Sequence, residues 1–286
     1  MQKTSLKTRR RSDDSGDIPD PGFERIRRIL RTLTGFHLLS YKDACIRRRL
    51  AVRMRAVGCA TAEEYADLLM RDRSEPGALI ETLTIHVSRF FRNPATFDKI
   101  RDEILPTLFA RSVNEGRRPL GIRSIGCSTG EEPYTLALIV RDSFAREMSA
   151  AGVSITASDV DPRVLRSAAR GVYEPDRVEG VPPRLLDRYF RRREDGWHLV
   201  PEIRNMVEFR QEDLLRSASG PECDLILCRN VLIYFDRFHQ EAILNGFAES
   251  LRSGGVLVLG KTETLLARAR GRFRALCPVE RIYRKI

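Results

Sequence analysis

Two glycines four positions apart precede two adjacent carboxylates in residues 126–132, a spacing that can hold a small organic ligand. Gly126 and Gly130 let the backbone turn tightly and approach a ligand, because neither carries a Cβ. Glu131 and Glu132 then open a helical pattern, and the first turn of a helix has unpaired amides. The motifs that bind polyphosphates or dinucleotides have other spacings. The segment therefore favours a nucleoside-like cofactor, with an ordinary turn as the alternative.

A third carboxylate, Asp159, ends an apolar segment at 154–159 that predicts a strand. In doubly wound sheets, ligands lie beyond the carboxyl ends of the strands. An acid at this place can accept hydrogen bonds from ribose hydroxyls. Asp159 could instead cap the helix that Pro162 begins, although Asp161 is the better capping candidate. Both roles for Asp159 stay open from the sequence.

The elements that would position these residues alternate between strands and helices from about residue 120 onward. Apolar runs at 223–228 and 256–260 predict buried strands, and 281–286 predicts a last strand. Residues 236–251 have helical spacing, and Gly254-Gly255 is expected to end that helix. Its buried stripe is expected to be Phe238, Ile243, Leu244, Phe247 and Leu251. The pattern predicts an α/β fold, a doubly wound and largely parallel sheet.

The region before this sheet predicts an all-α domain at 21–85. Phe23, Ile26, Leu30 and Leu33 fall at helical spacing, and Thr61 with Glu64 forms a capping box. Residues 1–20 are polar and basic, which predicts a disordered tail.

A linker is expected at 86–96, followed by a catalytic domain at 97–286. Within that domain, 171–212 is expected to be a small antiparallel β insertion, with 197–200 paired to 206–209. Pro182-Pro183 is expected to start a short helix there.

Three motifs carry a resemblance to a known family, at 88–92, 126–134 and 229–235. They read Ser-Arg-Phe-Phe-Arg, Gly-Cys-Ser-Thr-Gly-Glu-Glu-Pro-Tyr and Arg-Asn-Val-Leu-Ile-Tyr-Phe. In this order, over about residues 20–286, the chain resembles the chemotaxis receptor glutamate methyltransferases. The resemblance implies a Rossmann-like methyltransferase sheet and S-adenosylmethionine as cofactor, with S-adenosylhomocysteine as product. It also implies that the acceptors are glutamate side chains on the cytoplasmic helical bundle of chemoreceptors.

The resemblance also implies roles for individual residues. Arg92 would hold a carboxylate of cofactor or substrate in a two-pronged hydrogen bond, and Tyr234 would orient the substrate oxygen. The alternatives without a catalytic role are that Arg92 is an exposed arginine and that Tyr234 is an interfacial tyrosine. Glu132, or else Glu131, would bind the methionyl ammonium. The full set expected around the cofactor is His86, Ser88, Arg92, Gly126, Glu132, Asp159, Asp213, Leu214, Asn230 and Val231.

Two positions depart from the family pattern, because His86 and Ser88 stand where the family usually has Asn and Thr. Both side chains can still form hydrogen bonds, and a charged His86 would alter cofactor affinity near neutral pH. The alternative for His86 is a histidine at a helix end with no role in binding. Phe90 and Phe91 are expected to pack the linker on the core rather than to stack on adenine.

The formal net charge of +11 makes a nucleic-acid enzyme the natural rival. Part of the excess belongs to the tail, and part to a helix expected after residues 40–43, which resemble a capping box. Arg48, Arg49, Arg53 and Arg55 in that helix are candidates to bind the acidic receptor helix, with a solvated face as the alternative. Residues 229–232 do not form the Asp/Asn-Pro-Pro-Tyr-like turn expected of enzymes that modify base amines. No nucleic-acid partner is therefore expected.

Composition is consistent with a cytoplasmic, monomeric enzyme. Hydrophobic residues make up 42% of the 286 residues, and no apolar run is long enough to cross a membrane. The six cysteines lack metal-ligand spacing, so no metal is expected. Residues 191–196 contain one glycine, whereas members that tether a receptor's C-terminal pentapeptide have a glycine-rich loop there. Peptide tethering is therefore doubtful.

Overall fold

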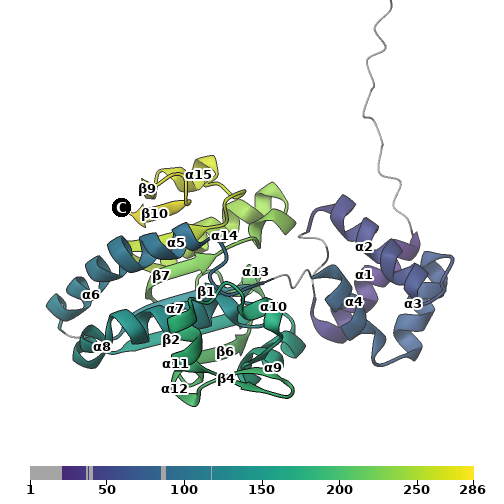
Figure 1. Ribbon diagram of the computed structural model, residues 1–286. Helices are drawn as coiled ribbons and strands as arrows, with labels where there is room; N and C mark the ends of the chain where they lie inside the picture. The colour runs from purple at the N-terminus through teal and green to yellow at the C-terminus, as the bar shows by residue number, and fades with distance from the viewer. Residues whose placement is uncertain (1–20, 37, 39–40, 85–87, 117) are drawn as a thin grey trace, which may run out of the picture.

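The computed structural model describes residues 21–36, 38, 41–84, 88–116 and 118–286. The tail at 1–20 and His86 therefore lie outside the described residues. Figure 1 shows four helices (α1–α4, purple to blue) on one side and the sheet with its helices on the other.

The helical part comprises α1 (Pro21–Thr34), α2 (Asp43–Ala56), α3 (Ala62–Arg71) and α4 (Glu75–Leu83). Its core is formed by residues including Ile26, Leu30, Tyr65, Leu69 and Leu79. The capping box of Thr61 and Glu64 is confirmed at the start of α3, with both reciprocal hydrogen bonds present.

Two expectations for this part are wrong. Helix α2 begins at Asp43, with Lys42 as its N-cap and no side-chain cap. Asp43 is therefore the first residue of the helix, whereas a capping box needs its carboxylate at the third. Leu33 is 51% exposed, because it lies in the last turn of α1, where the core ends.

The main sheet has seven strands in the order β6-β2-β1-β7-β8-β10-β9. Their bounds are β1 (Leu120–Ile125), β2 (Val153–Asp159), β6 (Val207–Gln211), β7 (Cys223–Cys228), β8 (Leu251–Leu259), β9 (Phe273–Cys277) and β10 (Ile282–Lys285). The first five strands in this order are parallel, and β10 is antiparallel to both of its neighbours. The predicted doubly wound sheet is confirmed, and its order reverses direction between β1 and β7.

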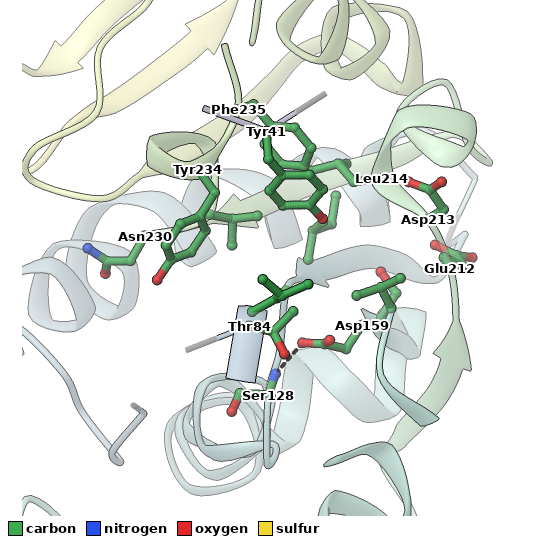
Figure 2. Close-up of a pocket in the computed structure, with 16 residues that line it drawn as sticks. Tyr41, Thr84, Ser128, Asp159, Glu212, Asp213, Leu214, Asn230, Tyr234 and Phe235 are labelled. Atoms are coloured by element: carbon green, nitrogen blue, oxygen red, sulfur yellow. Dashed lines mark hydrogen bonds between the residues drawn. The ribbon is translucent and has the colours of Figure 1, made fainter. Parts of the chain in front are cut away.

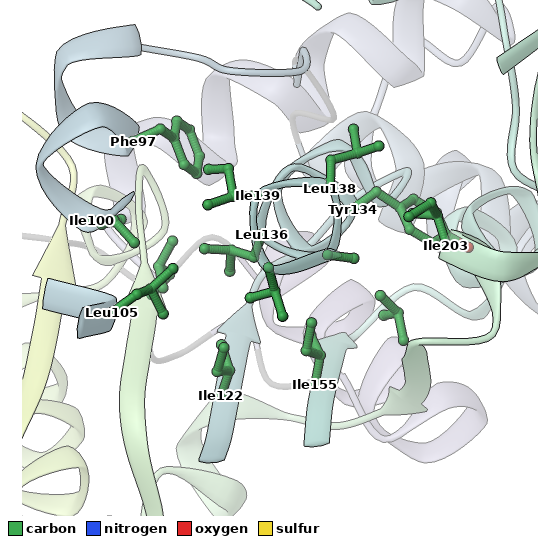
Figure 3. Packing of buried hydrophobic residues seen from close by; sticks show 14 of the residues in the cluster. Phe97, Ile100, Leu105, Ile122, Tyr134, Leu136, Leu138, Ile139, Ile155 and Ile203 are labelled. Atoms are coloured by element: carbon green, nitrogen blue, oxygen red, sulfur yellow. The ribbon is translucent and has the colours of Figure 1, made fainter. Parts of the chain in front are cut away.

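Helices cover this sheet. They are α5 (Pro94–Lys99), continued by a π turn (Ile100–Ile104) into α6 (Leu105–Asn114), then α7 (Glu131–Ser143), α8 (Ala145–Ala151), α9 (Pro162–Arg170), α13 (Leu214–Ser217), α14 (Arg237–Ser250) and α15 (Ala267–Arg270). Figure 3 shows α7 lying across β1 and β2, with Ile122 and Ile155 pointing toward it. Leu136, Leu138 and Ile139 of α7 are buried in the same cluster. This packing fixes the start of α7 above the carboxyl ends of β1 and β2.

The helix and strand that follow β7 differ from expectation. Helix α14 ends at Ser250 and β8 begins at the next residue, so Gly254-Gly255 lie inside a strand. A shift in the β7–β8 register and a positive φ of 69° at Gly254 show that these glycines accommodate an irregularity. Phe238 is 73% exposed rather than buried, because the first turn of α14 extends beyond the core.

A second sheet of three strands, in the order β3-β5-β4, lies below the main sheet in Figure 1. It comprises β3 (Val172–Tyr173), β4 (Phe190–Arg193) and β5 (Gly196–Leu199), with the short helices α10 (Pro175–Val178), α11 (Pro183–Tyr189) and α12 (Pro201–Arg204). The expected pairing of 197–200 with 206–209 is wrong, because β6 pairs parallel to β2 in the main sheet. Most of residues 191–196 is strand, and only Glu194 and Asp195 connect β4 to β5.

No helix in the described part of the chain is long and apolar enough to span a bilayer. Within the same residues, no group of His, Cys, Asp and Glu side chains is arranged to hold a metal ion.

Candidate functional site

The glycine turn after β1 is held against the end of β2. The amides of Gly126 and Cys127 both donate to the carbonyl of Ser158, at 2.8 and 2.9 Å. Gly126 has φ 70°, and a Cβ there would lie 2.3 Å from Val231 Cγ2, so a larger residue would displace Val231. Gly130 has φ 92° and is the N-cap of α7. Both glycines are required by backbone geometry and close packing.

Asp159 ties this turn to β2 and lines the cavity beside it. Its Oδ2 accepts from the Ser128 amide at 2.9 Å, and its Oδ1 accepts from the Asp161 amide at 3.1 Å. Asp161 is the N-cap of α9 and accepts from the Arg163 amide at 2.8 Å. The capping role therefore belongs to Asp161, as expected, whereas Asp159 lines the cavity.

The segment after β7 is positioned by a buried carboxylate that the sequence did not single out. Glu263 accepts from the amides of Asn230 and Val231, both at 2.9 Å, and of Gly260 at 2.6 Å. Burial raises the pKa of Glu263 despite these hydrogen bonds. Asn230 has φ 62°, a strained conformation that this carboxylate stabilises. An isolated glutamate in a loop gave no pattern by which this role could be predicted.

One cavity lies at the carboxyl ends of β1, β2, β6 and β7 (Figure 2). Nine residues of the predicted set or of the motifs line it: Gly126, Ser128, Asp159, Asp213, Leu214, Asn230, Val231, Tyr234 and Phe235. The cavity contains three carboxylates, of Asp159, Glu212 and Asp213. The lining residues that were not expected include Tyr41, Leu83 and Thr84 of the helical part. Asp213 also caps α13 by accepting from the Leu215 amide at 3.0 Å.

A second cavity is lined by Ser88, Arg92, Glu132 and Arg229. Gly126, Ser128, Asn230 and Tyr234 line both cavities, so the two are the ends of one cleft. The first is called the acidic end below, and the second the linker end. Every expected cofactor residue that the structure describes lies on this cleft. His86, the remaining member of the expected set, is outside the described residues.

The structure distinguishes the two adjacent glutamates. Glu132 lines the linker end, where it accepts from the Ser124 hydroxyl at 2.9 Å and from Arg229 Nη1 at 3.1 Å. Glu131 is buried away from that lining and accepts from the Thr129 hydroxyl at 2.8 Å. Glu132 is therefore the carboxylate that can meet a cation in the cleft.

The linker is packed as expected. Phe90 is fully buried and meets Tyr173 edge-on, with ring centroids 4.8 Å apart. Phe91 packs edge-on against Phe97 at 5.9 Å. Arg229 Nη2 donates to the Arg92 carbonyl at 2.7 Å, which fixes the backbone that carries the Arg92 side chain.

The four candidate arginines of α2 do not form one surface. Arg49 is buried, donates to the Leu83 carbonyl and lies over the Tyr234 ring. Arg53 forms a two-pronged pair with Glu75, at 2.8 and 2.5 Å, inside the helical part. Arg48 and Arg55 are exposed. Arg49 thus lies behind Tyr234, a residue that lines the cleft, whereas Arg53 belongs to the helical core and the other two arginines to the surface.

The cleft suits a ligand that carries polar groups at both ends. The hydroxyl of Ser128 and the Nε of Arg229 are buried and have no hydrogen-bond partner among the described residues. Carboxylates at the acidic end can accept from ribose hydroxyls and an amine, and Glu132 at the linker end can accept from an ammonium. Together with the mostly parallel sheet and its antiparallel β10, this cleft defines an S-adenosylmethionine-dependent methyltransferase.

The chain belongs to the CheR methyltransferase family. Residues 86–278 match the family model "CheR methyltransferase, SAM binding domain", and residues 21–84 match "CheR methyltransferase, all-alpha domain". The resemblance read from the three motifs is confirmed, as is the cofactor.

Relatives of this chain differ in length and setting. A chemotaxis protein methyltransferase of Listeria monocytogenes is 33% identical over 239 residues, which is 84% of this chain and 88% of that protein. A probable biofilm formation methyltransferase of Pseudomonas aeruginosa is 31% identical over 268 residues, or 92% of this chain and 61% of that protein. An uncharacterized 104.1 kDa protein of Rhodobacter capsulatus is 33% identical over 248 residues, and this chain spans only 26% of its length.

Proposed function

We propose that this enzyme transfers a methyl group from S-adenosylmethionine to glutamate side chains on the cytoplasmic helices of chemoreceptors, in sensory adaptation. The products are glutamate methyl esters and S-adenosylhomocysteine, and the enzyme acts in the cytoplasm. In this proposal residues 21–85 form the domain that meets the acceptor, and 97–286 form the transferase domain.

The observation that carries the proposal is the position of Tyr234. Tyr234 lines both ends of the cleft, and the buried Arg49 of the helical part lies over its ring. An acceptor that reaches the middle of the cleft therefore meets a phenol that can orient it, and the positive charge of Arg49 beyond that ring favours an acid. Both features suit a carboxylate better than a base or an amine.

The chemistry requires little from the protein beyond positioning. A glutamate carboxylate has an ordinary pKa of about 4.3, so it is already ionised at neutral pH and needs no general base. S-adenosylmethionine, when bound, supplies a methyl group on a positively charged sulfur. An anion and a cation become two neutral products, so surroundings that exclude water favour the transfer. Orientation of the acceptor oxygen by Tyr234 supplies much of the remaining rate acceleration.

The proposed cofactor contacts follow the two ends of the cleft. At the acidic end, Asp159 accepts from the ribose hydroxyls, and Asp213, Leu214, Asn230 and Val231 border the adenine. At the linker end, Glu132 binds the methionyl ammonium, and Arg92 holds the methionyl carboxylate or the acceptor carboxylate. Ser88 and Gly126 complete the site, and the role proposed for His86 rests on the family pattern alone.

The acceptor surface is proposed to include the exposed Arg48 and Arg55, on the helix that also carries the buried Arg49. Acidic residues on a receptor helix would be attracted to these side chains, and salt would screen the attraction. The excess positive charge of the chain, +11, is consistent with an acidic partner.

The test is transfer of a radiolabelled methyl group from S-adenosylmethionine to purified receptor cytoplasmic fragments. We expect label that mild alkali releases as methanol, because methyl esters hydrolyse and methylated amines do not. A fragment with its acceptor glutamates changed to alanine is the matched control and should stay unlabelled. Alkali-stable label, or none, would refute the proposal.

A second acceptor is favoured by one comparison. Because one relative is a probable biofilm formation methyltransferase, the acceptor could be a receptor of another signalling system. The same assay with receptor fragments from both kinds of system decides between them by kcat/KM.

A further inference from the structure

Tyr41 brings the helical part of the chain into the acidic end of the cleft. The Lys42 amide donates to the Tyr234 carbonyl at 2.8 Å, and Tyr41 forms an antiparallel bridge with Phe235. The Tyr41 ring is stacked on Phe235, with centroids 4.8 Å apart, and on Phe36 at 5.3 Å. These contacts fix the ring against the segment that carries Tyr234.

The hydroxyl of Tyr41 lies in the cavity. Figure 2 shows it turned inward, between Tyr234 on one side and Asp213 on the other. Burial, and then the charges of Asp213 and Asp159, raise the pKa of Tyr41. The phenol therefore stays protonated at neutral pH and can donate a hydrogen bond.

An adenine at this end of the cleft needs hydrogen-bond donors as well as acceptors. The carboxylates of Asp159, Glu212 and Asp213 only accept when ionised, which suits ribose hydroxyls and the exocyclic amine. The adenine ring nitrogens N1, N3 and N7 are acceptors, and each can be bound only by a donor. The Thr84 hydroxyl already donates to the Ile80 carbonyl at 2.7 Å.

We propose that Tyr41 is a cofactor-binding residue supplied by the helical domain, whose ring walls the adenine site and whose hydroxyl donates to an adenine ring nitrogen. This inference rests on the proposed function, because it takes the acidic end as the adenosine site. It follows that the cofactor is held fully only when the helical domain is docked on the sheet. Tyr41 lies two residues before α2, so cofactor binding also orders the start of the helix that carries Arg48, Arg49 and Arg55.

The first test measures S-adenosylhomocysteine binding by calorimetry in the full chain. Tyr41→Phe keeps the ring and removes the hydroxyl, and we expect the affinity to fall about three- to tenfold, the usual effect of one neutral hydrogen bond. Tyr65→Phe is the matched control. Its hydroxyl donates to Glu75 in the same domain, away from the cleft, so it should lower thermal stability and leave the affinity unchanged.

The second test identifies the contact with analogues of S-adenosylhomocysteine that lack one adenine ring nitrogen (1-, 3- and 7-deaza). For the wild-type protein, one analogue should bind three- to tenfold more weakly than S-adenosylhomocysteine itself. For Tyr41→Phe, that analogue and S-adenosylhomocysteine should bind with equal affinity. If every deaza substitution costs the same in both proteins, Tyr41 donates to no ring nitrogen and the proposal is wrong.

The outcomes separate this inference from the proposed function. If the wild-type protein binds S-adenosylhomocysteine and Tyr41→Phe binds it with the same affinity, the role proposed for Tyr41 is wrong and the proposed function is unaffected. If Asp159→Asn loses binding and Tyr41→Phe does not, the acidic end is the adenosine site but Tyr41 does not contribute to it. A wild-type protein that does not bind the compound overturns both.

Discussion

The guanidinium of Arg49 lies over the ring of Tyr234, with its central carbon 5.1 Å from the ring centroid. Arg49 belongs to α2 of the helical part, whereas Tyr234 follows β7 of the main sheet. Arg49 also donates to the carbonyl of Leu83, the last residue of α4. One buried side chain thus joins the proposed acceptor domain to the residue proposed to orient the acceptor.

Replacing Arg49 by methionine should lower kcat/KM for methyl transfer by about 3- to 30-fold, because a desolvated cation over an aromatic ring contributes about 0.5–2 kcal/mol. The cofactor contacts proposed above do not include Arg49, so S-adenosylhomocysteine affinity should change less than about twofold. Steady-state kinetics and calorimetry on one preparation measure both quantities. Arg48→Met is the control, since Arg48 is a neighbouring but exposed cation. An equal loss in both variants would mean that charge alone, and not the contact with Tyr234, matters.

Substitution by methionine should lower the stability of the protein at Arg53 but not at Arg55. Arg53→Met leaves the carboxylate of Glu75, only 4% exposed, without its guanidinium partner, and should lower the free energy of unfolding by about 1–3 kcal/mol. Arg55→Met should change it by less than about 0.5 kcal/mol, as exposed substitutions usually do. Urea denaturation measures both. Arg55→Met should in turn weaken the salt dependence of methyl transfer, and a salt dependence identical to wild type would remove Arg55 from the acceptor surface.

Substitutions of Asp159, the last residue of β2, and of Asp161 should have separate effects on cofactor binding and on stability. Asp159→Asn should weaken S-adenosylhomocysteine binding about 10- to 100-fold, since hydrogen bonds to a charged group contribute about 1.5–3 kcal/mol. Asp161→Ala removes the N-cap of α9 and should cost about 0.5–2 kcal/mol of stability with little change in affinity. Calorimetry and thermal unfolding of both variants test this. Retained affinity in Asp159→Asn would mean that Asp159 has a structural role, which includes its contacts with the Ser128 and Asp161 amides.

Glu131 should make stability depend on pH in a predictable direction. Burial raises the pKa of Glu131 above its usual value of 4.5, against the opposing hydrogen bond from Thr129. The folded chain therefore holds this proton more tightly than the unfolded chain. As the pH rises from about 4.5 toward the raised pKa, the unfolded chain loses its proton first, and the stability contributed by Glu131 falls.

Glu131→Gln lacks this titration and keeps an acceptor for the Thr129 hydroxyl. The free energy of unfolding of the wild type minus that of the variant should therefore decrease with rising pH, and then level off. Urea unfolding at several pH values gives this difference. A difference that grows as the pH rises would show that the native environment favours the ionised carboxylate instead.

The local sequence determined the strands, the glycine turn and the acids after the strands, because each depends on short-range properties. Apolar runs gave β2 and β7 nearly to the residue, and parallel strands bring their carboxyl ends to one edge, so Asp159 and Asn230 had to lie near one another. Asp213 was expected from the family resemblance alone, because the strand before it was assigned to the antiparallel insertion. The motifs then identified the family. Fold class, cofactor and most of the cleft followed from this.

Only the tertiary structure decided which of several similar side chains faces the cleft. Glu131 and Glu132 are adjacent in the chain, yet the packing of α7 buries one and presents the other. Arg49 and Arg53 lie one helical turn apart, yet one meets Tyr234 and the other Glu75. Tyr41 and Glu263 carry no local pattern, and their contacts with the segment after β7 exist only because distant parts of the chain pack together. Spacing along a chain specifies which residues share an element, whereas the partner of each side chain depends on how the elements are packed.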